Sequence, residues 1–436
     1  MRHRLTAEKD PSYLAALVAD RNGDVFELEG YAAAGMAGDR MMALTTGNTV
    51  SMPFGSELMM LPDRVPILFH IGKKRFETLA ENPQVPGQPV YPVAAFNSPG
   101  YVITGISAYA ERPNAGWLPL FSYGAVGWHR GRFRSAIFQV DREKRQDLRL
   151  MKPQKVAAGI EEKRKRMPNN RLRLHLEKCA LTYGCPAGKN FFLGRYEAPL
   201  PTSHLCNARC LGCISQQRSG LVPCTQERIG FTPTPKEISE VALAHIQKVT
   251  RSIVSFGQGC EGEPLTAYSV IEPAIRHMRA ATDKGTIHLN TNGSRPDLLE
   301  KLFDAGLDSM RVSINSVQEQ CYNGYFRPRG YRFADVVKGI DAALGRNKFV
   351  SLNYLQCPGF TDSVRELQAL IDFVREHPVH MIQWRNLNID PIRYWHAMTK
   401  SGARGDAIGM RRLYDEIRAK YPKLRHGYFN PPKETF

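Results

Sequence analysis

The sequence predicts a two-part α/β protein, in which an open partial (β/α)6 barrel follows a β-rich N-terminal domain. From about residue 199 onward, short apolar segments alternate with helical patterns, which is typical of βαβ units and a parallel sheet. Before residue 140, short apolar runs are separated by turn residues, and no long helical stripe competes with them. A chain of 436 residues is also long enough for a large core and an additional domain.

Residues 1–140 form the predicted β-rich domain. Its strand candidates follow turn signals, as in residues 25–28 after Asn22-Gly23 and residues 101–104 after Pro99-Gly100; another candidate spans residues 136–140. This segment contains no cysteine and no recognisable nucleotide or metal motif, so the sequence assigns it no role.

Residues 141–178 form a basic connector that we expect to be partly helical around residues 157–166. It contains the run Lys163-Arg164-Lys165-Arg166. Such a run could contact RNA or an anionic substrate. We favour a solvated helix instead, because Glu161 and Glu162 precede the basic residues and basic runs usually face water.

Residues 179–390 form the predicted barrel with a cysteine-rich entry. Strand candidates lie at residues 253–256, 287–290, 310–314, 350–354 and 381–384, with helix candidates near 235–250, 269–282, 296–305, 333–346 and 362–376. With one strand leading into the cysteine loop there are about six units, too few for a closed eight-unit barrel. Residues 391–436 form a short C-terminal extension that is basic and rich in aromatic residues.

The composition favours a cytoplasmic protein without a membrane partner. The N-terminus lacks an apolar signal region, and no stretch is long enough to span a bilayer. The nine cysteines are therefore expected to stay reduced and to serve metal binding or catalysis. The net charge of +17 favours an anionic partner.

The strongest motif is the spacing C-x3-C-x2-C formed by Cys206, Cys210 and Cys213. Three thiolates on one loop can each bind one iron of a cubane and leave the fourth iron without a protein ligand. The alternatives are three buried thiols or a zinc site, which would need a fourth ligand such as His204 or Cys224.

This loop resembles the signature of the radical S-adenosylmethionine (SAM) superfamily, and the resemblance covers about residues 199–390 without indicating a subfamily. It implies a partial (β/α)6 radical SAM barrel and a [4Fe–4S] cluster whose open iron chelates SAM. It further implies an electron donor such as ferredoxin or flavodoxin, and reductive cleavage of SAM to methionine and a 5′-deoxyadenosyl radical. No further catalytic residue is assigned.

Other segments match this family where predicted strands end. The resemblance implies that Gly262, Glu263 and Pro264 bind the methionine amine of SAM, with Glu263 as the main contact. It also implies SAM contacts from Asn292, Ser313, Asn315 and Gly359. One departure is Gly212, which replaces the aromatic residue that usually precedes the third cysteine; Leu211 or Ile214 could substitute for it.

Four further cysteines could close a second [4Fe–4S] cluster, because four thiolates satisfy a cubane completely. They are Cys179, Cys185, Cys224 and, as the most favoured fourth ligand, Cys260. The alternative is that all four are small buried hydrophobic residues. Cys321 and Cys357 are expected to pack in the core.

Two polar or aromatic segments would face the barrel mouth. Residues 322–331 interleave aromatic and arginine side chains that could stack on bases, although a packed loop is the favoured interpretation. Arg385, Asn386 and Asn388 follow the last predicted strand and are candidate contacts to substrate or SAM.

The leading hypothesis is a radical SAM enzyme that acts on an unidentified anionic substrate, which could be RNA, a metabolite or cofactor precursor, or a protein. A second hypothesis is a non-catalytic iron–sulfur or zinc protein that binds nucleic acid and senses redox state. It is disfavoured because it gives Glu263, Asn292 and Ser313 no purpose.

Overall fold

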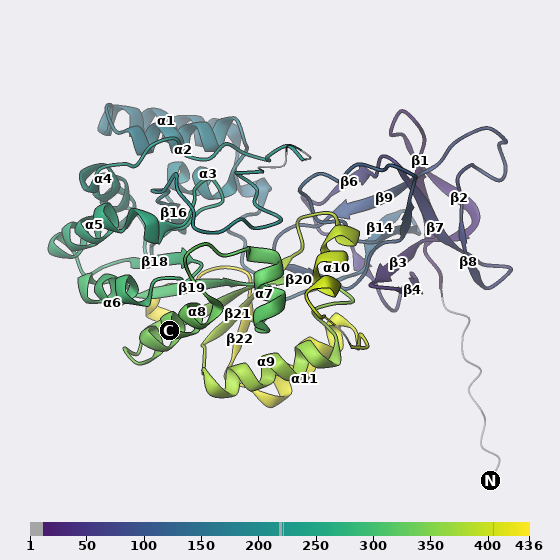
Figure 1. The fold of residues 1–436 in the computed structure, drawn as a ribbon. Helices are drawn as coiled ribbons and strands as arrows, with labels where there is room; N and C mark the ends of the chain where they lie inside the picture. Colours follow the sequence, from purple (N-terminus) through teal and green to yellow (C-terminus); the bar gives the residue numbers. More distant parts are fainter. Residues whose placement is uncertain (1–11, 218–219, 221, 404) are drawn as a thin grey trace, which may run out of the picture.

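The computed structural model describes residues 12–217, 220, 222–403 and 405–436, and Figure 1 shows their arrangement. The strand-rich N-terminal region lies on one side and an α/β unit lies on the other. None of the helices in these ranges is long and apolar enough to cross a membrane.

The N-terminal region is built from short antiparallel strands. Ten of them form one sheet, which contains the path β12-β7-β2-β1-β13-β14-β5, and smaller sheets pair β10 with β15 and β11 with β3 and β4. The strands are β1 Ala15–Ala19, β2 Val25–Ala32, β3 Ala34–Ala37, β4 Arg40–Ala43, β5 Val50–Ser51, β6 Glu57–Met60, β7 Arg64–His70, β8 Arg75–Thr78, β9 Tyr91–Phe96, β10 Tyr101–Ile103, β11 Ile106–Ser107, β12 Tyr109–Glu111, β13 Val126–His129, β14 Arg132–Ser135 and β15 Ile137–Gln139.

The connector is helical, with η1 Leu148–Leu150, α1 Pro153–Arg166, α2 Arg171–Leu181 and α3 Pro186–Leu193. Its basic run does not present four free charges to solvent. Lys163 is buried at 1% exposure and lies over the Phe191 ring, while Arg164 pairs with Glu161 and Glu177. The run lies on a helix, as expected, and Arg164, Lys165 and Arg166 are exposed, but the expectation that the run faces water is wrong for Lys163.

The α/β unit is a partial barrel, a curled sheet of parallel strands in sequence order from β16 to β22. Its strands are β16 Glu197–Pro199, β17 Ile253–Phe256, β18 Thr286–Thr291, β19 Ser309–Ile314, β20 Phe349–Gln356, β21 Met381–Asn386 and β22 Arg425–Gly427. Its helices are α4 Pro235–Ile246, η2 Pro264–Ala267, α5 Tyr268–Ala281, α6 Pro296–Ala305, α7 Glu319–Phe326, α8 Phe333–Leu344, α9 Val364–Glu376, α10 Pro391–Lys400, α11 Met410–Lys420 and η3 Lys433–Thr435.

Two parts of the barrel differ from the sequence prediction. Residues 322–331 were expected to form a packed loop, but the segment begins within α7; Tyr322 and Tyr325 are buried in the core, whereas Arg327 and Arg329 are exposed. The C-terminal extension supplies a seventh parallel strand, β22. It is only three residues long and begins with an exposed arginine, so it has no apolar pattern to detect.

The two faces of the barrel sheet differ in chemistry. Alternate residues of a strand point to opposite faces. On β19 and β21 one set is apolar and buried, as in Val312 and Trp384, and packs in the main core with the surrounding helices. The other set is polar, and it lines the inside of the curled sheet: His288, Asn290, Arg311, Ser313, Ser351, Asn353, Gln383 and Arg385.

The N-terminal region packs against the loops that follow β20 and β21. Arg64 and Asp390 form a fully buried ion pair at 2.7 Å. Asn386 accepts a hydrogen bond from the Ile103 backbone N–H at 3.0 Å and donates one to the Tyr101 carbonyl oxygen at 2.9 Å. The barrel mouth is thus partly framed by β10 and its neighbours.

Candidate active site

The cysteine loop follows β16 and is fastened by a buried carboxylate. Glu261 accepts hydrogen bonds from the backbone N–H groups of Thr202 and Ser203 at 2.8 and 3.0 Å. Its other oxygen accepts from the N–H groups of Gly257 and Gln258, both at 2.7 Å. One side chain therefore ties the approach to the cysteines to the end of β17.

The three cysteines face a shared space on this loop. All three are partly buried and unpaired, and they influence one another electrostatically. Burial raises the pKa of the Cys206 thiol to about 11, so bound cations are needed to hold the ligands as thiolates. Arg228 donates a hydrogen bond to Cys213 Sγ at 3.4 Å and adds positive charge beside it. The donor set and its surroundings fit an iron–sulfur cluster.

Glu263 lies where the loop after β17 meets β18. Its carboxylate accepts hydrogen bonds from Thr291 Oγ1 at 2.5 Å, from the Asn292 N–H at 2.8 Å and from the Leu265 N–H at 3.1 Å. Burial raises its pKa to about 7 despite these donors. The same segment packs tightly on the cysteine loop, because a Cβ on Gly262 would lie 1.8 Å from the Leu205 carbonyl oxygen.

Asn292 links the end of β18 to the cysteine loop. Its Nδ2 donates to Asn207 Oδ1 at 2.7 Å, and its Oδ1 accepts from the Ser294 N–H at 3.0 Å. Asn207 Nδ2 in turn donates to Ser294 Oγ at 2.9 Å. The structure therefore brings Asn292 and Glu263 next to the cysteine loop, a proximity that their order in the sequence does not establish.

Gly212 occupies a position with no room for a side chain. A Cβ there would lie 2.5 Å from Ile389 Cγ2 and 2.8 Å from the hydroxyl oxygen of Tyr325. Asn388 Nδ2 also donates to the Gly212 carbonyl oxygen at 3.0 Å. An aromatic residue at position 212 would therefore not fit, because Tyr325 of α7 and Ile389 after β21 already fill the space beside the loop.

Three other predicted SAM contacts lie in different surroundings. Ser313 is partly exposed on the inner face of the sheet. Asn315 is fully buried, and its Nδ2 donates to the Cys321 carbonyl oxygen and to the Tyr394 hydroxyl. Gly359 packs on the N-terminal region, where an added Cβ would lie 2.0 Å from the Gly38 nitrogen. Asn315 and Gly359 thus have packing contacts that account for their residue types.

The structure groups only part of the predicted second cluster. The Sγ atoms of Cys179 and Cys260 lie within 4.8 Å of each other and of a ring nitrogen of His175, and Cys185 interacts electrostatically with both. Cys224 is exposed elsewhere and accepts a hydrogen bond from the Gln217 N–H. Cys321 and Cys357 are buried, as expected for packing residues.

Two arginines lie close together inside the barrel, and the sequence analysis named Arg385 as a candidate contact but missed Arg311. Arg311 of β19 donates to Gln383 Oε1 at 2.7 Å, and Arg385 of β21 donates to the same oxygen at 3.2 Å. Neither forms an ion pair with a carboxylate among the described residues. Burial, with repulsion from Arg385, lowers the pKa of Arg311 to about 9. The strict alternation of Arg311 and Ser313 with apolar neighbours was the signal that could have identified this face.

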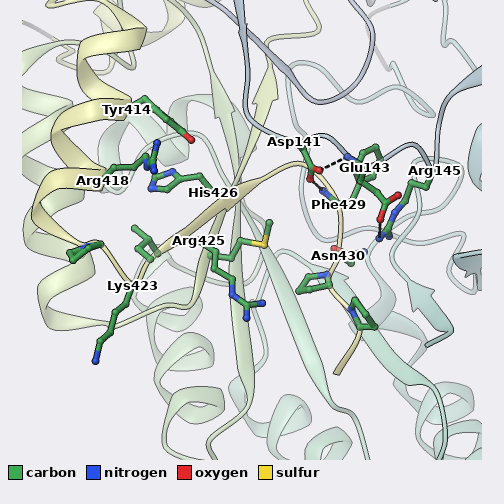
Figure 2. Close-up of a pocket in the computed structure, with 15 residues that line it drawn as sticks. Asp141, Glu143, Arg145, Tyr414, Arg418, Lys423, Arg425, His426, Phe429 and Asn430 are labelled. Atoms are coloured by element: carbon green, nitrogen blue, oxygen red, sulfur yellow. Dashed lines mark hydrogen bonds and ion pairs between the residues drawn. The ribbon is translucent and has the colours of Figure 1, made fainter. Parts of the chain in front are cut away.

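A cavity of about 550 Å³ lies at the start of β21 and β22 (Figure 2), and one of its lining residues, Asn430, accepts a hydrogen bond from Arg311. Its lining includes Arg418, Lys423 and Arg425, but none of the cysteines. The reacting groups of barrel enzymes gather at the opposite, carboxyl ends of the strands. We therefore assign the catalytic site to the cysteine loop and the inner face of the sheet.

Comparison with known families decides the class of this site. Residues 200–374 match the model of the radical SAM superfamily. The chain carries a radical SAM domain. It is accordingly an enzyme, with a [4Fe–4S] cluster and SAM as its cofactors. The family match and the curated relatives give no support to the alternative of a non-catalytic nucleic-acid-binding sensor.

Curated relatives of this chain are similar over part of their length. The GTP 3′,8-cyclase of Pseudomonas putida strain W619 is 28% identical over 172 residues, which cover 39% of this chain and 46% of that protein. The probable GTP 3′,8-cyclase of Methanococcus maripaludis is 25% identical over 226 residues, covering 50% and 69%. The chain spans about half the length of the first of these relatives.

Solved structures of other radical SAM proteins resemble the chain more distantly. SuiB of Streptococcus suis bound to S-adenosylmethionine is 14% identical with a TM-score of 0.39, covering 54% of this chain and 51% of that one. Methylornithine synthase is 14% identical with a TM-score of 0.38, covering 57% and 70%.

Proposed function

We propose that this radical SAM enzyme acts on a small phosphate-bearing substrate, held inside the barrel by Arg311 and Arg385. The observation that carries the proposal is a pair of guanidinium groups on the inner face without a carboxylate partner among the described residues. Buried cations are costly unless they are paired. An anionic substrate would supply the missing partner.

The surroundings of the two arginines support a binding site rather than a packed core. The Arg311 Nε is buried without a hydrogen-bond partner, which leaves one donor for a ligand. Arg385 lies over the Tyr428 ring at 3.5 Å and donates to Asn353 Oδ1 at 2.9 Å, so its plane is fixed. Fixed guanidinium groups bind phosphate with little loss of side-chain entropy.

The nearby acid does not neutralise this pair. Glu197 is the carboxylate closest in the network, since Asn430 bridges it to Arg311. Glu197 is already paired with Arg145 at 3.1 Å. In the part of the chain that the structure describes, Arg311 and Arg385 therefore have only Glu197 nearby, and Glu197 is already paired with Arg145. The interior retains a net positive potential that attracts anions.

The cysteine loop and Glu263 would position the cofactors at the mouth of the same interior. Cys206, Cys210 and Cys213 would hold the cluster, and Glu263 with the neighbouring Gly262 and Pro264 would contact the methionine part of SAM. Together the bound cofactors supply a 5′-deoxyadenosyl radical that can abstract a hydrogen atom from a substrate. Ser313 lies on the inner face two residues beyond Arg311, and the register of the strands places it at a level between Arg311 and Arg385. A one-electron donor such as ferredoxin or flavodoxin would complete the system.

GTP is the first substrate to test, because curated relatives are named as GTP 3′,8-cyclases and GTP carries three phosphates. Anaerobic, reconstituted protein is mixed with dithionite, SAM and GTP, and 5′-deoxyadenosine is quantified. We expect GTP to bind and to increase 5′-deoxyadenosine formation. Cys210→Ala should abolish the product but still bind GTP.

The arginine variants test the proposed pocket. Arg311→Gln and Arg385→Gln should each weaken GTP binding by about tenfold or more, the loss of about 1.5–3 kcal/mol expected for a charge-assisted hydrogen bond. Arg375→Gln is the matched control, since Arg375 is exposed on α9. SAM affinity should not change in any of the three. Unchanged GTP affinity in both inner-face variants, or loss of SAM affinity instead, would contradict the assignment.

A further inference from the structure

A second group of metal-binding side chains lies outside the cofactor site. His175 and Cys179 are on α2, and Cys260 is in the loop between β17 and η2, so the group joins segments far apart in the chain. One ligand atom from each of these residues lies within 4.8 Å of the other two. Among the described residues, this is the one set of three that meets that distance.

The local sequence explains how α2 and the following loop present these ligands. His175 and Cys179 are four residues apart, so they lie on the same face of the helix. Gly184, with φ of +64°, turns the chain back, and the Cys185 N–H donates to the Cys179 carbonyl oxygen at 3.0 Å. This hydrogen bond holds Cys185 beside Cys179, but the Cys185 Sγ lies outside the compact group of His175, Cys179 and Cys260.

We propose that His175, Cys179 and Cys260 bind one zinc ion, and that Cys185 of the adjoining loop turns in to complete its tetrahedral coordination. This differs from the second cluster expected from the sequence, because His175 replaces Cys224 and a single ion replaces the cubane. Three thiolates and one imidazole form a common ligand set of structural zinc sites.

The distance between His175 and Cys179 favours one ion over a cluster. With Zn–S of about 2.3 Å and Zn–N of about 2.05 Å, a tetrahedral site places its sulfur and nitrogen ligands about 3.6 Å apart. The observed distance from His175 Nε2 to Cys179 Sγ is 3.5 Å. Thiolates of a cubane bind different irons and lie further apart. Consistent with this, Cys206, Cys210 and Cys213 do not form such a compact group within the described ranges.

The burial of the site and its place in the fold suggest a structural role. Cys179 and Cys260 are 2% and 6% exposed, which protects bound zinc from exchange. Cys260 directly precedes Glu261, whose carboxylate fastens the cysteine loop. Zinc would therefore fix α2 to the segment that carries Glu261 and Glu263.

Metal analysis tests this proposal without measuring turnover. The full chain is expressed in medium containing iron and zinc, purified anaerobically and analysed by mass spectrometry for both metals. We expect about one zinc per chain in the wild type and in the triple variant Cys206→Ala, Cys210→Ala, Cys213→Ala, which should lose its iron. The double variant Cys179→Ser, Cys260→Ser should lose zinc and keep the iron of the SAM cluster.

Two further variants keep the test informative if that double variant does not fold. Cys224→Ser should retain zinc, because Cys224 lies outside the group. His175→Cys should also retain it, and cobalt substitution should then show stronger thiolate-to-cobalt absorption than in the wild type. About eight irons per chain without zinc would overturn the proposal in favour of a second cluster, and absence of both metals from the triple variant would overturn it altogether. Neither result bears on GTP binding at the arginines.

Discussion

The carboxylate of Glu261 provides the sharpest test of how the cysteine loop is held. It accepts four backbone hydrogen bonds at 2.7 to 3.0 Å, two on each oxygen, and it is buried at 4% exposure. In Glu261→Gln the amide nitrogen cannot accept, so two of these N–H groups lose their partner. An unsatisfied buried donor costs about 1–3 kcal/mol, and the variant should therefore be destabilised by about 2 kcal/mol or more.

Urea unfolding of the anaerobic holoenzyme at pH 8, followed by circular dichroism, measures this change. Iron content should fall in parallel, because the segment leading to Cys206 loses its attachment. Glu227→Gln is the matched control: Glu227 is 70% exposed and pairs with exposed Lys178, so no measurable change is expected. Wild-type stability and iron content in Glu261→Gln would refute the view that this carboxylate holds the loop.

Other parts of the structure give further predictions. Burial raises the pKa of Glu366 to about 7, so the folded protein favours the protonated carboxyl and should lose stability as pH rises from about 4.5 to 7. Glu366→Gln should remove this loss. The variant and the wild type should then have equal unfolding midpoints at pH 4.5, and the variant should be more stable at pH 8. Asp390→Asn should destabilise the protein by about 1.5–3 kcal/mol, because buried Arg64 would keep only the partly exposed Glu111, at 3.2 Å, as its counter-charge, and a midpoint within error of wild type would disprove this. Gly212→Ala should reduce iron incorporation because its Cβ would collide with Ile389, an effect measured by iron analysis and absent if the loop has spare room.

Much of the barrel could be predicted from local sequence. The apolar runs at residues 253–256 and 310–314 correspond to β17 and β19, and the helix predicted at 296–305 is α6 with the same bounds. Spacing alone identified the three-cysteine loop, because three thiolates within eight residues can share one cluster wherever the loop lies. Both signals depend on neighbouring residues in the sequence, so they can be recognised without knowledge of the fold.

Contacts between distant segments decided the rest. His175 meets Cys260, and Arg311 meets Arg385, only because the sheet curls and α2 packs beside the loop after β17. No periodicity in the sequence shows that two distant segments are close in space, which is why Cys224 was grouped with Cys179 and why Arg385 was named without Arg311. The sequence by itself determined the class of chemistry, since ligand type and spacing are local properties. Only the tertiary structure decided which further side chains share a site, because that depends on how distant strands and loops pack.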